Sequence, residues 1–123
     1  MKYMEVIHCI DSVTATTTSE AISIEGAVRV TIVVQRSDHS SGSTALTVDV
    51  SPDATNWIAY DKLIDNVTNT NGQNLTRVTT KTLSADGIDF VSMDTTTDCL
   101  PWLRVKATET TDGTHDVWVI IQR

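Results

Sequence analysis

Apolar and polar residues alternate along much of the chain with a period of two, which is the period of a β-strand. The run AVRVTIVVQR places apolar side chains on one face at Val28, Val30, Ile32 and Val34. The run TALTVDV does the same at Leu46, Val48 and Val50, and the polar loop SDHSSGS separates the two runs. Together they predict an antiparallel hairpin over residues 28–50, with His39 at its exposed tip.

A second hairpin with the same outline is predicted over residues 102–121. Its two runs, WLRVKAT and DVWVIIQR, have apolar residues at Leu103, Val105, Ala107, Val117, Val119 and Ile121. Between them lies TTDGTH, whose Asp-Gly pair tolerates a positive φ at low cost and is typical of a turn. This turn predicts an exposed tip at Asp112 and Gly113, with His115 beside it.

Further strands are predicted at Met4–Ile10, Ala21–Ile24, Leu75–Leu83 and Ile88–Met93, and NVTNTNGQN is a polar loop. The sequence has no βαβ alternation and no long amphipathic helix, and its abundant threonine and valine favour sheet. We therefore expect one all-β domain over residues 1–123, an antiparallel, jelly-roll-like β-sandwich with less than about 10% helix. Residues 1–12 are expected to form an N-terminal arm or an edge strand.

The segment VSPDATNWIAYDKLI allows two interpretations. Ser51 and Pro52 suit the start of a helix, and Trp57, Tyr60 and Ile64 would then lie on one face of it. The alternative is a Pro-Asp turn followed by a strand from Trp57 to about Lys62. The turn is favoured, because the segment is rich in Asp and Asn and its neighbours are all strand-like.

Charge and cysteine content narrow the classes of partner. The formal net charge is −7 and the sequence pI is about 4.6, so neither nucleic acid nor an anionic membrane is an expected partner. The first residues, MKYMEVIHCID, lack the apolar run of a signal peptide, which predicts a protein made in the cytoplasm. Cys9 and Cys99 are then expected to be free thiols rather than a disulfide.

No established catalytic or cofactor-binding motif is present in the sequence. The three histidines, His8, His39 and His115, carry no motif spacing, so neither catalytic residues nor a cofactor are predicted and the chain is not expected to be an enzyme. DTTTD at residues 94–98 and SPDATN at 51–56 place oxygen atoms close together, but both lack the acidic density of a calcium loop. No metal site is predicted.

Four aromatic residues are candidates for an interaction surface: Trp57, Tyr60, Trp102 and Trp118. Trp118 falls on the strand face opposite Val117 and Val119, so its side chain is expected to point away from the core. Such aromatics serve either as packing, at a subunit contact or within the chain, or as platforms for carbohydrate rings.

The motifs SPDATNW, WLRVK, TDGT and VWVI, taken in this order, resemble small β-sandwich proteins of tailed bacteriophages, in particular the capsid decoration, or cement, proteins. The resemblance runs from about Glu20 to Arg123. The family pattern often has Gly where this chain has Ala54. The family contributes no catalytic residues.

This resemblance implies a jelly-roll-like, non-enzymatic protein that oligomerises, often as a homotrimer, and binds the major capsid protein at the virion surface. A free sheet edge in such a fold would be satisfied by symmetric assembly. The alternative function is a carbohydrate-binding module of a phage tail or a bacterial surface protein, which would share the fold.

Overall fold

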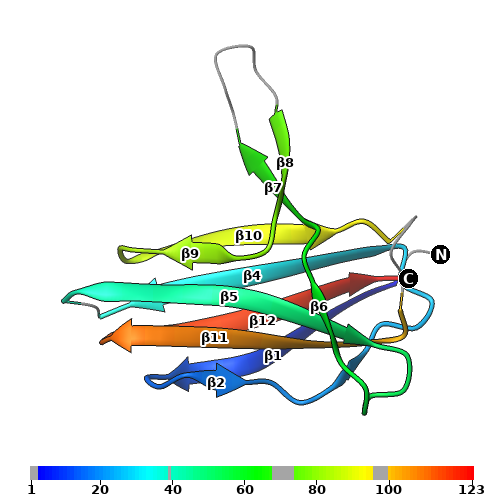
Figure 1. Ribbon diagram of the computed structural model, residues 1–123, viewed down its shortest axis with the longest axis horizontal. Coiled ribbons are helices and arrows are strands. Elements are labelled where there is room, and N and C mark those ends of the chain that lie inside the picture. Colours follow the sequence, from blue (N-terminus) through cyan, green and yellow to red (C-terminus); the bar gives the residue numbers. More distant parts are fainter. Residues whose placement is uncertain (1–2, 39, 68–73, 96–99) are drawn as a thin grey trace.

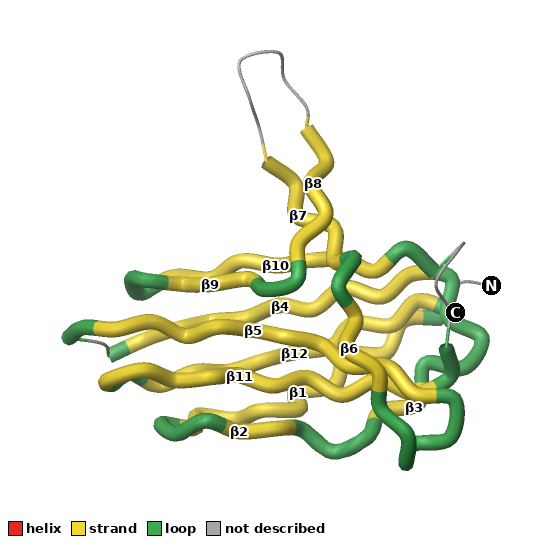
Figure 2. Tube along the Cα trace, in the orientation of Figure 1, coloured by secondary structure: helices red, strands yellow, loops and turns green. Residues whose placement is uncertain are grey.

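The chain folds as a sandwich of two antiparallel sheets (Figure 1). The computed structural model describes residues 3–38, 40–67, 74–95 and 100–123. These residues form strands and turns and no helix (Figure 2), so the predicted fold class is confirmed. The described residues therefore also contain no apolar helix of the length that would cross a membrane.

Sheet A contains most of the longer strands. Its order is β1 (Met4–Val13), β12 (Thr114–Gln122), β4 (Arg29–Ser37), β10 (Gly87–Met93), β7 (Leu63–Val67) and β8 (Asn74–Val78). The N-terminal segment thus forms an edge strand, β1, paired along its length with β12. At the other end of the sheet, β7 and β8 form a hairpin that projects from the body of the sandwich (Figure 1).

Sheet B covers the inner face of sheet A. Its order is β2 (Thr17–Thr18), β11 (Trp102–Thr111), β5 (Gly42–Ser51) and β6 (Ile58–Tyr60), with β3 (Ile22–Ser23) paired to β11 and β9 (Lys81–Leu83) paired to β5. The chain changes sheet at most of its connections, namely β1 to β2, β3 to β4, β4 to β5, β6 to β7, β8 to β9, β9 to β10, β10 to β11 and β11 to β12. Strands that follow one another across the two sheets in this way form a jelly roll.

The two predicted hairpins are wrong as pairings. β4 pairs with β12 and β10, whereas β5 pairs with β11, so residues 28–50 form an arch between the sheets. Residues 102–121 form a second arch, because β11 lies in sheet B and β12 in sheet A. The alternation of apolar residues could not separate the two cases, because both strands of an arch and both strands of a hairpin bury one face.

The core lies between the two sheets, and the alternating residues form a large part of it. From sheet A it contains Val30, Ile32, Val34, Val117, Val119 and Ile121, and from sheet B it contains Leu46, Val48, Val50, Leu103, Val105 and Ala107. Complete burial of each large aliphatic side chain contributes about 1.5–3 kcal/mol. Val28, expected to join this face, lies just before β4 and is exposed.

Two other predicted strands are shorter than expected. The predicted strand over residues 75–83 is divided into β8 and β9, which belong to different sheets. The strand expected from Trp57 to Lys62 is confined to β6. In both places a short polar segment, residues 79–80 or 61–62, interrupts the alternation and lets the chain change direction.

The segment after β5 is a turn, as predicted, and Asp53 organises it. The Asp53 carboxylate accepts hydrogen bonds from the backbone N–H groups of Thr55 (2.9 Å) and Asn56 (2.8 Å) and from the Asn56 amide (2.6 Å). The N–H groups of Asn56 and Thr55 hold the pKa of the Asp53 carboxyl well below its usual range. Its oxygens are therefore occupied by the turn itself and are not directed toward a ligand.

Replacing Ala54 by glycine should stabilise the protein. Ala54 has a φ of 63°, in the left-handed region where a Cβ atom costs about 1–2 kcal/mol. Glycine removes that cost but loses more backbone entropy on folding, so we expect a net gain of about 0.5–1 kcal/mol for Ala54→Gly. Urea unfolding of the two proteins measures this difference, and an equal or lower midpoint for the variant would contradict it.

Candidate functional site

Four of the seven exposed large apolar side chains among the described residues lie on the outer face of sheet A. Met4 and Val6 of β1 are 62% and 60% exposed, and Ile88 and Phe90 of β10 are 62% and 44% exposed. The strands between them, β12 and β4, add partly buried apolar side chains at Trp118, Ile120 and Val33. We call this set, together with His8, the outer face of sheet A.

Two rows of residues on this face run across four strands and contain no Asp, Glu, Lys or Arg. The pairing register aligns His8, Trp118, Val33 and Phe90 in one row, and Val6, Ile120, Thr31 and Ser92 in the next. The chain as a whole carries a net charge of −7. Because these rows contain no acidic residue, two copies could make contact there without like-charge repulsion between the residues of the rows.

At the β1 end of the face, His8 stacks on Trp118. The two rings lie 4.6 Å apart between centroids with an interplanar angle of 13°. Trp118 does point away from the core, and the histidine ring covers part of it. The stack fixes the orientation of the His8 ring and directs its Nε2 atom along β1 toward Asp116.

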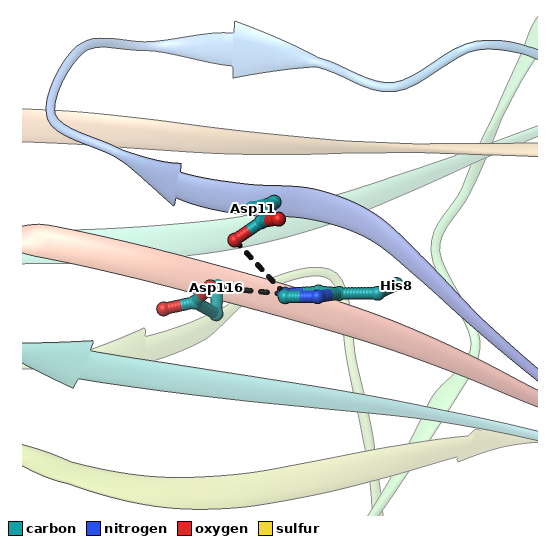
Figure 3. A group of neighbouring side chains, drawn as sticks. All are labelled: His8, Asp11 and Asp116. Atoms are coloured by element: carbon teal, nitrogen blue, oxygen red, sulfur yellow. Dashed lines mark hydrogen bonds and ion pairs between the residues drawn. The ribbon is translucent and has the colours of Figure 1, made fainter.

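His8, Asp11 and Asp116 form a cluster at the end of β1 (Figure 3). His8 Nε2 lies 2.9 Å from Asp116 Oδ1 and 3.9 Å from Asp11 Oδ1. In a regular strand, residues three apart point to opposite faces. The pairing of β1 with β12 is irregular between His8 and Ile10 and again before Val13, and this bulged geometry brings Asp11 to the same face as His8.

The four aromatics predicted as an interface do not form one surface. Trp118 lies on the outer face of sheet A, whereas Trp102 lies on β11 in sheet B, next to the buried Leu103. Trp57, which precedes β6, packs against Arg104 of β11. The guanidinium carbon of Arg104 lies 4.4 Å from the centroid of the Trp57 ring. Tyr60 is 6% exposed and belongs to the core of the chain itself.

The His8 cluster could not be found from the sequence. His8 and Asp116 are separated by 108 positions, and no local motif joins them. Only the pairing of β1 with β12 brings them together, and the bulge that adds Asp11 has no recognisable signature in MEVIHCIDSV. The predicted oxygen-rich segment 94–98 lies only partly within the described residues.

A buried polar cluster joins the ends of the two arches. The Arg36 guanidinium, which is completely buried, donates to the carbonyl oxygens of Ser41 (2.8 Å), Gly42 (3.0 Å) and Asp112 (2.6 Å). It also lies 3.3 Å from the Glu109 carboxylate. One side chain thus fastens the β4–β5 arch to the β11–β12 arch.

His115 belongs to this cluster and is not at an exposed tip, which corrects the expectation from sequence. Its side chain is 0% exposed, and its Nδ1 atom lies 3.5 Å from Glu109 Oε2. His115 lies two residues before Val117 and shares the inward face of β12 with it. The strand period recognised for the valines therefore also buries the histidine. His39 lies outside the described residues.

Asp112 secures the second arch from its outer side. Its carboxylate accepts hydrogen bonds from the Ser40 hydroxyl and from the backbone N–H groups of Ser40 (2.9 Å) and Ser41 (3.1 Å). These bonds, of which the one from the Ser40 hydroxyl has the largest effect, lower the pKa of the Asp112 carboxyl to about 2. The Asp-Gly turn is therefore bound to the neighbouring arch, and Gly113 is buried, which corrects the free tip expected there.

Cys9 is a free thiol that should react slowly in the folded protein. Burial raises its pKa to about 11, and its Sγ donates to the carbonyl oxygen of Val117 at 3.4 Å. Since the thiolate is the nucleophile, alkylation of native Cys9 by iodoacetamide should be much slower than that of the unfolded chain at neutral pH. The native rate should rise as the pH approaches 11, and equal rates would contradict the burial of this thiol. Cys99 lies outside the described residues.

A groove of about 640 Å³ lies between β1 and the segment of residues 18–23. Its charged residues include Glu5 and Arg123, whose side chains pair at 2.7 Å. Arg123 donates further to the carbonyl oxygens of Ser23 (2.9 Å) and Glu25 (3.0 Å). The guanidinium therefore ties Arg123, which follows β12, to β1, to β3 and to the turn at Glu25.

The fold is similar to that of the SPBc2 prophage-derived protein YomS. The two structures match with a TM-score of 0.68 over 100% of this chain and 96% of that one, at 12% sequence identity. A structure of infectious bursal disease virus, Gx strain, matches 99% of this chain and 33% of that chain with a TM-score of 0.46 and 10% identity. No protein-family model and no curated protein sequence matches the chain.

The comparison with YomS shows the fold that the two chains share. The similarity to YomS extends over the whole chain, so it covers both sheets and both arches. At 12% identity it does not transfer a function or a set of site residues. The similarity to the virus structure is too low to support an argument.

Proposed function

We propose that this chain is a non-enzymatic structural protein of a bacteriophage particle, and that it works by self-association through the outer face of sheet A. The observation that carries this proposal is the pair of uncharged rows on this face, one containing the exposed Val6 and the other the exposed Phe90. Contiguous apolar surface on a small soluble protein marks an interaction site. The similarity of the fold to a prophage-derived protein supports the same class.

The edge strand β1 extends this surface. β1 is the first strand in the order of sheet A and carries Met4, Val6 and His8 outward. An edge strand presents unpaired backbone N–H and C=O groups that favour pairing with another chain. A second copy that covers the outer face beside β1 would bury the aromatic stack and this edge together.

The finer proposal is a capsid decoration protein that forms a homotrimer and binds the major capsid protein at the virion surface. Its support is the resemblance of the turn motifs to that family, and Ala54 agrees with it, because the position where the family often has glycine has a φ of 63°. In a closed trimer each copy contacts the next through two different surfaces, so the outer face of sheet A of one copy would meet another surface of its neighbour. Such a protein would reinforce a preformed shell without chemistry.

Binding to particles tests the role on a shell. Source particles stripped of this protein should bind it again in co-sedimentation, at a fixed ratio to the major capsid protein. Phe90→Lys should reduce the bound amount, since it places a charge on the outer face, whereas Ile58→Lys alters an exposed apolar residue of sheet B and should not. Absence of binding by the unaltered protein would overturn the decoration role.

The carbohydrate-binding alternative has less support from the described aromatics. A sugar ring needs an open aromatic face, and Arg104 lies over the Trp57 ring while His8 lies over Trp118. Binding of a glycan with a change in tryptophan fluorescence, in a protein that does not bind particles, would favour this alternative instead.

A further inference from the structure

We propose that His8, Asp11 and Asp116 bind a divalent transition-metal ion of the zinc type. The three side chains offer an imidazole nitrogen and two carboxylate oxygens, and these atoms all lie within 4.8 Å of one another (Figure 3). Neutral imidazole together with carboxylate is a donor set suited to zinc, cobalt or nickel ions. Calcium and magnesium prefer oxygen donors alone, so the His8 nitrogen favours the transition metals.

The spacing of the donor atoms fits one shared ion. Zinc lies about 2.0–2.2 Å from both imidazole nitrogen and carboxylate oxygen, which places two tetrahedral ligands about 3.4 Å apart. The distances from His8 Nε2 to Asp116 Oδ1 and to Asp11 Oδ1 are 2.9 and 3.9 Å, one on each side of that value. Small side-chain rotations would bring all three atoms to the ion.

Two of the three ligands are already held in place. The ring of His8 is stacked on Trp118, and Asp116 Oδ1 accepts a hydrogen bond from the backbone N–H of Ser12 at 2.8 Å. The Asp116 side chain is only 13% exposed, which restricts it further. Asp11, with a side chain 72% exposed, has the freedom to complete the set.

The ion would join the edge strand to its neighbour. His8 and Asp11 belong to β1 and Asp116 belongs to β12, so a shared ion crosses the bulged end of their pairing. Three protein ligands leave further coordination positions for water, so the ion should exchange with solvent. All three ligands belong to one chain, so the site does not require the proposed function and would exist in a monomer, although His8 also belongs to the outer face of sheet A.

Calorimetric titration of the metal-free protein with zinc chloride tests the site. We expect one ion per chain at this site and a rise in the unfolding temperature with added zinc, because an ion that binds the folded state stabilises it. His8→Phe keeps an aromatic ring to stack on Trp118 but removes the nitrogen, and it should weaken binding by about tenfold or more. Asp11→Asn should also weaken it.

Asp61→Asn is the matched control, since it removes one negative charge from the exposed segment between β6 and β7. This variant should bind zinc as the unaltered protein does. Binding that persists unchanged in His8→Phe would place the ion elsewhere and overturn the proposal. If the titration shows no binding, the cluster is only a set of hydrogen-bonded side chains, and the proposal is overturned as well.

Tryptophan fluorescence gives a second readout that does not depend on stability. A paramagnetic cobalt(II) ion on His8 Nε2 would lie next to Trp118, whose ring is stacked on His8 at 4.6 Å. Cobalt chloride should therefore quench the emission in a saturable manner, with the same stoichiometry as zinc, and zinc should reverse the quenching by competition. Saturable quenching of equal size in His8→Phe would contradict the site.

Discussion

Glu109→Ala should lower the free energy of unfolding by about 3–5 kcal/mol, because it leaves a buried charge without its partner. The Arg36 and Glu109 side chains are 0% and 3% exposed and lie 3.3 Å apart. Glu109 also accepts a hydrogen bond from the Thr44 hydroxyl and faces His115. Removing its carboxylate therefore affects three buried polar side chains at the crossing of the two arches.

The matched control is Asp49→Ala, which breaks the pair between Asp49 and Arg104 on sheet B. That pair has a similar geometry at 2.9 Å, but its side chains are 30% and 33% exposed. Partly exposed ion pairs contribute about 0–1 kcal/mol, so the control should be nearly neutral. Chemical unfolding followed by circular dichroism measures both values, and equal effects of the two substitutions would contradict the role assigned to the buried cluster.

Among the described glycines, Gly42 should tolerate replacement by alanine least. Gly42 begins β5 at a φ of 84°, and a Cβ atom built there would lie 1.9 Å from the backbone oxygen of Thr110. The left-handed conformation costs about 1–2 kcal/mol, and forcing the two arches apart adds about 1–3 kcal/mol. Thr110 cannot yield easily, because the contact is with its backbone.

Gly26→Ala separates the two costs. Gly26 has a similar φ of 76°, but a Cβ atom there would meet no other atom within 4 Å. This variant should lose only the conformational part, about 1–2 kcal/mol. The difference between the variants in urea unfolding then measures the contact of the arches, and a Gly42→Ala protein as stable as Gly26→Ala would contradict that contact.

The strands could be predicted from the sequence because burial on one face leaves a period of two. The alternating runs around Ile32 and Val119 predict strands where the structure has β4 and β12, and both of these side chains are completely buried. The pairing of the strands could not be predicted in the same way. The period says which face of a strand is buried but not which strand lies alongside it.

The candidate site depends on long-range pairing, and for that reason the sequence did not reveal it. The outward position of Trp118 could be predicted from the neighbouring valines. Its partner His8 could not, because His8 is 108 positions from Asp116 and contacts Trp118 and Asp116 only through the register of β1 with β12. Asp11 joins them through a bulge, which reverses the face expected from its spacing. His115 shows the opposite case, since the strand period alone would have placed it in the core.

The mass of the protein in solution tests the central claim, self-association through the outer face of sheet A, most directly. Size exclusion with light scattering at tens of micromolar should give three times the 13.4 kDa of one chain. Phe90→Lys should shift the mass to that of a single chain, whereas Ile58→Lys should leave the trimer intact, since Ile58 is 57% exposed but lies in sheet B. A mass of 13.4 kDa for the unaltered protein, or a trimer that Phe90→Lys does not disturb, would contradict the account.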